Sequence, residues 1–533
     1  MQSIRSAGTT GVVGTARKDV PGMGTAHVTA ARFLELALIF TFIAHGLAML
    51  GMALLLLPGM PGGGQDAAAR MTYVAAHPWL WRLGWLPWQL TALSDVLLAL
   101  ALVRTRWIPR LPAALTLLVT LAAVIPDQVG QALWITRGVA LAQSGDAATY
   151  AAFEVRTFLW IAAWGGTLYT VGAYGWTWCF ARAGTWNRAL TWLSVVVWGL
   201  FTLVNVGPLL PDALRPPAAL VAAGNAVGFV LLLAWTALVA ELVLRRARPD
   251  APHGRYAPWR APRGPLALPL DLVANSRFVR AICELLPVLA EYSDIRDVVY
   301  VNYVVPAERL EPLVPVELEL QRIGPGGRYA FCSFLTFRHG HFGPALLGPL
   351  RRLLPSPVQT NWRIHVRDPR TGALGVYFVT NTITSPPHAL AARMLSEGMP
   401  MHLPRRGEVR RATGGALRIQ LDAGGGSAPE AEAELRPLAE RPASGPWSVA
   451  FDSYAEMLAY CVPQDRALST QPWYRRTTRQ EIALGIPLDA CEPLECTVRS
   501  QTAHTLVGDA EPFAFRVARL RFRFLREYHD RWE

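Results

Sequence analysis

The feature that most constrains this chain is a series of long apolar segments that ends at Leu244. Directly after it, Arg245 and Arg246 begin an Arg- and Pro-rich strip, RRARPDAPHGRYAPWRAPRGP, which runs to Pro265. Segments of about 20 apolar residues match the roughly 30 Å hydrocarbon core of a bilayer, where only helices satisfy their own backbone polar groups. We therefore predict a membrane-spanning N-terminal part and a C-terminal part that folds in water.

The composition agrees with a membrane component. Of the 533 residues 52% are hydrophobic and only 17% are charged, whereas a soluble domain has about 25% charged residues. The net charge of +12 is concentrated at the ends of apolar segments, which favours a membrane surface over nucleic acid as the partner. The six cysteines form no CxxC pair, so we expect buried free thiols.

Six spans are predicted within residues 31–244, and the third is interrupted by Pro126-Asp127-Gln128. We expect residues 1–30 to be disordered, because they are rich in Gly, Ala and Thr and lack periodicity. Residues 245–296 are expected to form a basic linker and an amphipathic surface helix, with Arg277 and Arg280 toward the headgroups. The predicted spans are about Phe33–Leu57, Trp85–Val103, Leu111–Trp134, Thr157–Phe180, Leu190–Leu210 and Ala218–Leu244.

The distribution of basic residues predicts the orientation, because Lys and Arg are enriched in cytoplasmic connections. With the N-terminus inside, the inner connections hold most of them, and the outer ones hold only Arg70, Arg82, Arg137, Arg156 and Arg215. Six crossings then place both the N-terminus and residues 297–533 in the cytoplasm. The expected inner residues are Arg5, Arg17, Lys18, Arg32, Arg104, Arg106, Arg110, Arg182, Arg188 and the arginines of 245–263.

Polar residues inside the spans suggest two interpretations. His45, Asp95 and Asp127 could form a proton or ligand path, because ionisable groups at that depth are costly and often functional. Alternatively they make interhelical hydrogen bonds, for example between Asp95 and His45 or Gln89. Glu35, which lies near Arg32 at the inner end of the first span, is expected to be merely interfacial.

From Asp297 onward the pattern changes to alternation and short β-branched runs typical of strands. A helix is expected at His388–Glu397, and GPGG and DPRTGALG are expected turns. Residues 297–533 are therefore predicted to form an α+β, antiparallel, barrel-like domain. The expected strands are Val298–Val305, Glu317–Gln321, Tyr329–Arg338, Trp362–Arg367, Val376–Thr382, Arg418–Leu421, Glu432–Leu438, Thr497–Thr502 and Phe513–Phe524.

Three stretches in this half, Tyr303–Leu320, Thr360–Thr384 and His388–His402, resemble the YqjF-like family, a domain of unknown function related to the acetoacetate decarboxylase fold. The resemblance covers roughly Asp297 to Phe524 and implies a bent antiparallel barrel whose interior can hold a small ligand. The helical half resembles uncharacterised bacterial multi-pass membrane families, without a specific residue pattern.

The decarboxylase reaction itself is not expected to accompany the fold. It requires a Schiff-base lysine, and Lys18, which precedes the first predicted span, is the only lysine in the chain. Arginine cannot replace it, because the guanidinium stays protonated and is not nucleophilic.

Candidate ligand-binding residues lie on two predicted strands. Asn361, Arg363 and His365 are spaced i, i+2, i+4 and so share one face, and Tyr377 and Thr380 lie on the partner strand. An inward Arg363 could bind a carboxylate or phosphate through charge-assisted bonds. The alternative is that this row is the outer face, with Trp362, Ile364 and Val366 forming the core.

A second hypothesis concerns histidines. His339 and His341 have a spacing compatible with metal ligands, but a catalytic site needs about three protein ligands, and the preferred interpretation is surface and turn histidines. We find no GxGxxG, GxxxxGK, GxSxG or HExxH motif, and we expect no cofactor and no metal.

The preferred functional hypothesis is a multi-pass protein of a bacterial inner (plasma) membrane, with a cytoplasmic barrel that binds a small apolar, anionic molecule. Its expected partners are the lipid bilayer and this ligand, and not nucleic acid. One alternative is an enzyme acting on a lipid- or ketide-like substrate without a Schiff-base lysine. Another is transport through the helices. The sequence does not indicate the oligomeric state.

Overall fold

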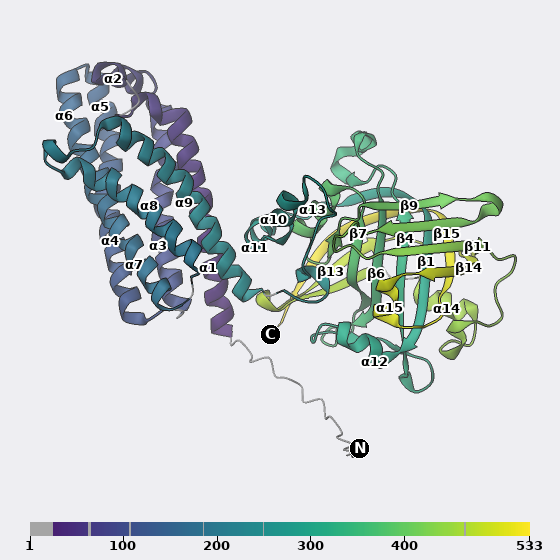
Figure 1. Cartoon of the computed structure of the whole chain (residues 1–533). Coiled ribbons are helices and arrows are strands. Elements are labelled where there is room, and N and C mark those ends of the chain that lie inside the picture. The colour runs from purple at the N-terminus through teal and green to yellow at the C-terminus, as the bar shows by residue number, and fades with distance from the viewer. Residues whose placement is uncertain are drawn as a thin grey trace, which may run out of the picture.

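The chain folds into a helical N-terminal region and a sheet-rich C-terminal region, joined near the end of helix α9 (Ala218–Ala247) (Figure 1). The computed structural model describes residues 25–61, 65–105, 108–184, 186–248, 250–462 and 465–532. Of the predicted disordered segment 1–30, residues 1–24 lie outside this range, and the chain is helical from Thr25. The six cysteines are free thiols, as predicted.

Long helices running back and forth make up the N-terminal region. Three π-helical segments lie among them in the described part of the chain: Met52–Leu56 continues α1, Trp134–Gly138 extends α4 into α5, and Leu159–Gly165 joins α6 to α7. The helices are α1 (Thr25–Gly51), α2 (Ala67–Ala76), α3 (Pro78–Thr105), α4 (Arg110–Leu133), α5 (Val139–Ser144), α6 (Ala147–Phe158), α7 (Gly166–Arg182), α8 (Arg188–Val206) and α9.

Five helical stretches among the described residues are long and apolar enough to cross a membrane. The predicted span at Thr157–Phe180 is not one of them, so a bundle of six spans is not confirmed. This segment is helical, but its many Trp, Tyr, Gly and Thr residues make it less apolar than the others. The five candidate spans are Ala30–Gly59, Pro78–Thr105, Arg110–Ser144, Arg188–Val206 and Ala219–Arg246.

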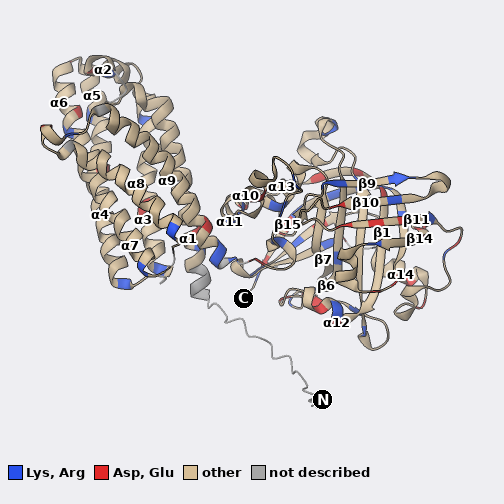
Figure 2. Ribbon diagram, in the orientation of Figure 1, with Lys and Arg blue, Asp and Glu red and all other residues tan. Residues whose placement is uncertain are grey.

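The beginning of the first long helix and the end of the last lie at the same end of the helical region. Figure 1 shows α2, α5 and α6 at the end remote from the C-terminal region, whereas the start of α1 and the end of α9 lie beside it. Basic residues gather at this near end, and most of the helical surface is uncharged (Figure 2).

The two regions are joined by a buried carboxylate. Glu35 of α1 is inaccessible to solvent and accepts hydrogen bonds from Arg248 Nη2 at 2.8 Å and Trp473 Nε1 at 2.8 Å. The Tyr474 hydroxyl lies 2.9 Å from the second carboxylate oxygen, and Arg32 also pairs with Glu35. The prediction that Glu35 is merely interfacial is therefore wrong, because Trp473 and Tyr474 bind it from the far end of the sequence.

Two short helices, α10 (Ala267–Asn275) and α11 (Arg277–Cys283), lie between the regions (Figure 1). Glu241 of α9 accepts bonds from the Ser276 hydroxyl at 2.9 Å and the Phe278 amide at 3.0 Å. This carboxylate therefore holds the N-terminus of α11 against α9, where its charge is favourable.

The predicted direction of two arginines on α11 is wrong. Arg277 and Arg280 are buried and do not face outward. They donate to backbone carbonyls, from Arg277 Nε to Arg248 at 3.0 Å and from Arg280 Nη1 to Arg255 at 2.9 Å. The linker packs against α11, and its backbone carbonyl oxygens accept the hydrogen bonds that water would otherwise accept from the two guanidinium groups.

The C-terminal region is one largely antiparallel sheet whose strand pairing returns on itself. The long strand β15 (Phe513–Arg531) pairs with β13 and also with β1 (Glu291–Pro306), so that β1, β4, β6, β7, β12, β13 and β15 form a ring. The remaining strands of this path extend from β15 through β14, β11 and β10 to β9. Bounds of the other main strands are β4 (Tyr329–Arg338), β6 (Val358–Arg367), β7 (Leu374–Ile383), β9 (Arg406–Arg411), β10 (Leu417–Asp422), β11 (Ala431–Pro437), β12 (Arg466–Gln471), β13 (Arg476–Ala483) and β14 (Glu492–Arg499).

Both faces of the ring are apolar, and each packs against different elements. The Tyr300 face carries Tyr300, Phe331 and Phe515 and packs against helix α14 (Tyr454–Cys461). The Trp362 face carries Trp362 and Ile364 and packs with apolar residues of β9, β10 and β11 and of helix α15 (Gln501–Val507). Burial on both faces explains why these strands read as near-continuous runs of apolar residues. The sheet-rich character predicted for this half is confirmed.

Candidate functional site

Two of the predicted ligand residues project from the Tyr300 face. Arg363 and His365 lie two residues apart on β6 and are both buried. Arg363 is opposite Ser333 of β4, and its guanidinium carbon lies 5.4 Å from the centre of the Tyr300 ring. Trp362, Ile364 and Val366 do form core, as the alternative expected, but the row with Arg363 and His365 is buried as well, because both faces of the strand are covered.

Arg363 has few hydrogen-bond partners for a buried cation. Its Nε donates to the Ser333 hydroxyl at 3.1 Å and its Nη2 to the Cys461 carbonyl at 3.4 Å. Among the described residues no carboxylate lies within ion-pair distance of it, although its exposed fraction is only 3%. A charge in such surroundings is normally paired, because transfer out of water is expensive.

Neutral polar groups surround this guanidinium. Both ring nitrogens of His365 and the hydroxyl of Tyr300 are buried without a hydrogen-bond partner in the part of the chain that the structure describes. Burial, followed by the charge of Arg363, lowers the pKa of His365 well below its usual value, so the imidazole is neutral. Burial likewise raises the pKa of Tyr300.

A thiol lies next to the same group. Burial raises the pKa of Cys461 to about 12 in spite of the nearby Arg363 charge, and its Sγ lies 3.6 Å from Asn302 Oδ1. A thiol with such a pKa is protonated at neutral pH and is a poor nucleophile.

The other predicted ligand residues lie elsewhere. Asn361 accepts a bond from Gln359 Nε2 at 2.8 Å and is partly buried. A β-bulge between Trp362 and Arg363 places Tyr377 opposite Ile364 and Thr380 opposite Trp362, so both belong to the Trp362 face. Thr380 there lines a separate open pocket of about 350 Å³, together with Val379, Thr502, Thr505 and Leu506.

His339 and His341 do not act together. The ring nitrogens of His339 lie 2.9 Å from the Ser293 hydroxyl and 2.8 Å from Gln359 Oε1, and burial lowers its pKa to about 3. His341 has a left-handed backbone conformation with a φ of 53°. No group of three or more His, Cys, Asp or Glu side chains suited to a metal is found among the residues described.

The polar residues of the helical region make interhelical contacts. His45 Nε2 lies 3.9 Å from Asp95 Oδ1. Asp127 accepts from Gln131 Nε2 at 2.8 Å, and Gln131 Oε1 in turn accepts from Gln89 of α3 at 2.9 Å. The His45–Asp95 contact joins two residues named in the structural interpretation but is longer than a hydrogen bond, and the bond between Asp127 and Gln131 lies within α4.

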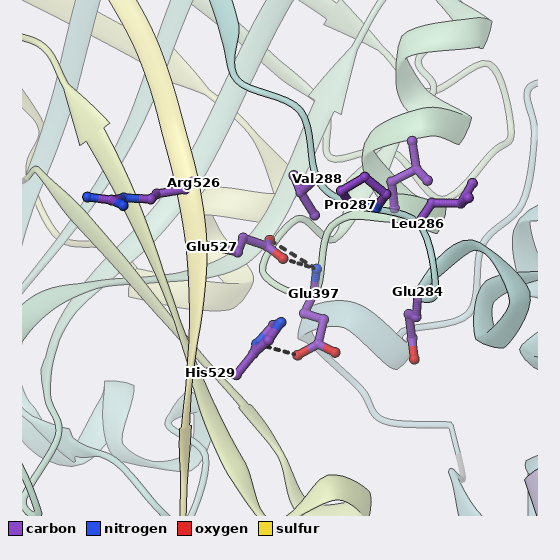
Figure 3. Close-up of a pocket in the computed structure, with 9 residues that line it drawn as sticks. Glu284, Leu286, Pro287, Val288, Glu397, Arg526, Glu527 and His529 are labelled. Carbon is purple, nitrogen blue, oxygen red and sulfur yellow. Dashed lines mark hydrogen bonds and ion pairs between the residues drawn. The ribbon is translucent and has the colours of Figure 1, made fainter. Parts of the chain in front are cut away.

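A pocket of about 300 Å³ lies beside the junction of the two regions (Figure 3). Figure 3 shows Glu527 and His529 of β15 pointing toward Glu397, while Arg526 on the same strand points away. Glu527 Oε1 accepts from the Glu397 amide at 3.1 Å and from the Ser396 hydroxyl at 2.6 Å. The apolar part of the pocket wall consists of Leu286, Pro287, Val288 and Leu395.

Glu397 is the most strongly held acid of this pocket. It pairs with Arg476 and accepts from the Thr478 hydroxyl, and Arg255 Nη1 lies 3.6 Å from its Oε1. Burial alone would raise the pKa of Glu397, but the charges of Arg255 and Arg476 outweigh it and lower the pKa to about 2. The Glu397 carboxylate is therefore ionised at neutral pH.

Sequence reasoning missed the junction residues. Glu397 was placed at the end of a predicted helix, and helix α13 (Pro386–Leu395) indeed ends just before it. Its partners Arg255, Arg476 and Thr478 come from the linker and from β13, more than 75 positions away along the chain. No local pattern in the sequence marks such a pairing.

Comparisons with known proteins support the resemblance noted in the sequence. Residues 293–459 match the model of the DUF2071 family, described as an uncharacterized conserved protein. The match includes the three stretches that carry the YqjF-like resemblance, which is thereby confirmed for this segment. No curated protein matches the chain in sequence.

Solved structures that resemble the C-terminal region include two kinds of enzyme. The enduracididine biosynthesis enzyme MppR, complexed with pyruvate, is 15% identical, with a TM-score of 0.31, over 46% of this chain and 91% of that chain. An acetoacetate decarboxylase-like enzyme from Sphingomonas wittichii RW1 is 9% identical, with a TM-score of 0.32, over 46% of this chain and 96% of that chain.

The low pKa of Glu397 predicts a loss of stability in acid. The carboxylate favours the folded state above its unfolded pKa of about 4.3, and this contribution is lost as pH falls toward 2. A shift of about two units corresponds to roughly 3 kcal/mol. We expect Glu397→Gln to lower the thermal midpoint of the full chain in detergent at pH 7 and to flatten its dependence on pH between about 5 and 2.

The matched control is Glu440→Gln, because Glu440 is exposed. This variant should follow the pH dependence of the unmodified chain. A Glu397→Gln variant that loses stability in acid as steeply as the unmodified chain would contradict the assignment.

Proposed function

We propose that this chain is a multi-pass membrane protein whose C-terminal region binds a small molecule bearing a carboxylate, with Arg363 as its anchor. The observation that carries the proposal is a buried guanidinium without a carboxylate partner, beside unpartnered polar atoms of His365 and Tyr300. Buried polar groups without partners are rare in folded proteins. An anionic ligand would satisfy the charge and the open hydrogen-bonding positions together.

Other buried arginines of the chain differ in their surroundings. Arg280 and Arg393 also lack a carboxylate, and each donates to two backbone carbonyls, at 2.9 and 3.5 Å for Arg280 and at 2.9 and 2.6 Å for Arg393. Each of them keeps one guanidinium nitrogen without a partner among the described residues. Arg363 donates to one hydroxyl at 3.1 Å and to one carbonyl at 3.4 Å, and its guanidinium also lies close to the Tyr300 hydroxyl and the Cys461 thiol. Arg363 differs from these two arginines in the open hydrogen-bonding positions of His365 and Tyr300 beside it, and for this reason we assign the ligand to the Tyr300 face.

The chemistry of the group supports binding over catalysis. The pKa of His365 lies well below neutrality, and that of Cys461 is about 12. Neither side chain is poised to exchange a proton near pH 7, which is what a general acid or base requires. We therefore propose a binding or sensing role in preference to an enzyme.

We further propose six membrane crossings, in which the helix Ala147–Arg182 is added to the five candidate spans. Glu35 near the start of α1 and Arg248 just after α9 are hydrogen-bonded to each other, which supports an even number of crossings with both ends of the helical region at one membrane surface. The excess of basic residues in the connections on this side favours the cytoplasm of a bacterial inner membrane.

The carboxylate site predicts a loss of anion binding in Arg363→Gln. We use hexanoate and its neutral isostere hexanamide as probes, and follow binding to the full chain in nanodiscs by calorimetry. A charge-assisted hydrogen bond contributes about 1.5–3 kcal/mol, so hexanoate should bind about 10- to 100-fold more weakly to the variant. Hexanamide should bind the unmodified chain as weakly as hexanoate binds the variant.

The control is Arg367→Gln at the exposed end of the same strand, which should bind hexanoate normally. Equal hexanoate affinity in Arg363→Gln and the unmodified chain would refute the site, as would an absence of hexanoate binding to the unmodified chain.

Six crossings predict opposite accessibility for the two ends of the helix Ala147–Arg182. Ser144→Cys and Ala183→Cys place thiols at exposed positions just outside these ends. In intact spheroplasts an impermeant maleimide should label the first variant, and it should label the second only after permeabilisation. The unmodified chain measures background from the native thiols. Equal labelling of both variants from one side would show that this helix does not cross.

A further inference from the structure

Three leucines project from one short segment at the edge of the C-terminal region. The 3₁₀ segment η10 (Ala345–Leu353) consists of two turns joined at Gly348, where φ is 48°. Leu346, Leu350 and Leu353 are 70%, 62% and 82% exposed. Single exposed leucines are common, but a cluster on one segment marks an interaction surface.

The cluster continues toward the membrane-spanning helices. η10 follows the short strand β5 (Gly343–Pro344), which pairs with Glu291 and Tyr292 at the start of β1. The Ala345 amide donates to the Ala290 carbonyl at 2.8 Å, so η10 lies beside the segment that follows α11. That segment exposes three more leucines, and we name the six together the leucine ridge: Leu285, Leu286, Leu289, Leu346, Leu350 and Leu353.

Helix α11, which precedes the first leucines of the ridge, packs against the membrane-spanning helix α1. Phe278 of α11 packs edge-on against Phe42 of α1, with ring centres 5.1 Å apart, and the preceding helix α10 exposes Leu268 and Leu272. Exposed leucines thus recur along the chain from α10 to Leu289, starting about 20 residues after the end of α9.

The charges of η10 suit a bilayer surface. The segment holds Arg351 and Arg352 in its last turn and no acidic residue. Arg352 is exposed, and the guanidinium of Arg351 lies 5.6 Å from the Tyr292 ring centre. Leucines beside arginines are typical of segments that enter the headgroup region of an anionic bilayer.

We infer that η10 is a second membrane contact, whose leucines insert into the leaflet that α9 leaves and whose arginines meet anionic headgroups. The inference rests on the proposed membrane location. Because α9 already tethers the region to the bilayer, insertion is an intramolecular event and needs only weak intrinsic affinity. The contact would hold the C-terminal region against the lipid surface at a point distinct from the Glu35 junction.

The experiment uses photo-crosslinking from single positions of the full chain. Benzoylphenylalanine replaces Leu350 in nanodiscs containing about one third phosphatidylglycerol, and mass spectrometry detects phospholipid adducts after irradiation. Val316, 87% exposed between β-strands of the same region, is the matched position away from the ridge. Leu118 of α4, 61% exposed, is the position expected to touch lipid in any case.

We expect lipid adducts from positions 350 and 118 and none from 316. In the background Arg351→Glu with Arg352→Glu, adducts at 350 should fall at least threefold while those at 118 stay unchanged. Adducts at 118 without adducts at 350, or crosslinks from 350 to a second copy of the chain, would overturn the inference. Absence of adducts at both positions would instead refute the membrane location itself.

Discussion

A single buried carboxylate, that of Glu35, determines how the two regions are joined. A charge without solvent is tolerated only when paired and hydrogen-bonded, and here the partners are Arg248 of the linker with Trp473 and Tyr474 of the C-terminal region. Since α1 supplies the acid and sequence more than 400 positions later supplies two of the donors, the arrangement requires both regions to be folded and in contact. The helices and the sheet are therefore parts of one structure.

From this point a chain of ion pairs leads to the junction pocket. The Tyr474 hydroxyl lies 2.6 Å from Glu284 as well as near Glu35, Glu284 pairs with Arg255, and Arg255 approaches Glu397. Each carboxylate in this chain of ion pairs lies beside an arginine. The group around Arg363 is the opposite case, since its cation has no acid and its neutral neighbours have open positions. Paired charges serve the architecture, and we assign ligand binding to Arg363, which has no acid and lies beside neutral groups with open hydrogen-bonding positions.

Local patterns predicted local structure well, and long-range pairing not at all. The alternation of Tyr329–Arg338 matches β4 residue for residue, and the i, i+2 spacing of Arg363 and His365 does put them on one face. Tyr377 and Thr380 both lie on the Trp362 face, because a β-bulge at Trp362 shifts the register between β6 and β7. No pattern in this sequence predicts the bulge. Glu35 was expected at the interface because its partners Arg248 and Trp473 lie far along the chain. Arg280 was expected to face the headgroups because its partners are backbone carbonyls of the nearby linker and α10, which no side-chain pattern marks. The helix at Thr157–Phe180 was predicted from length, but its Trp and Gly content leaves it less apolar than the other spans.

The most direct test of the junction is a double-mutant cycle between Glu35 and Arg248. Thermal unfolding of the full chain in nanodiscs is followed by tryptophan fluorescence for Glu35→Gln, Arg248→Met and the double variant. If the pair joins the two regions, each single change removes the closest buried partner of the other charge and leaves Arg248 with Glu284 alone or Glu35 with Arg32 alone. The double variant is then more stable than additivity predicts by about 1–3 kcal/mol. Strict additivity of the two changes would contradict the account.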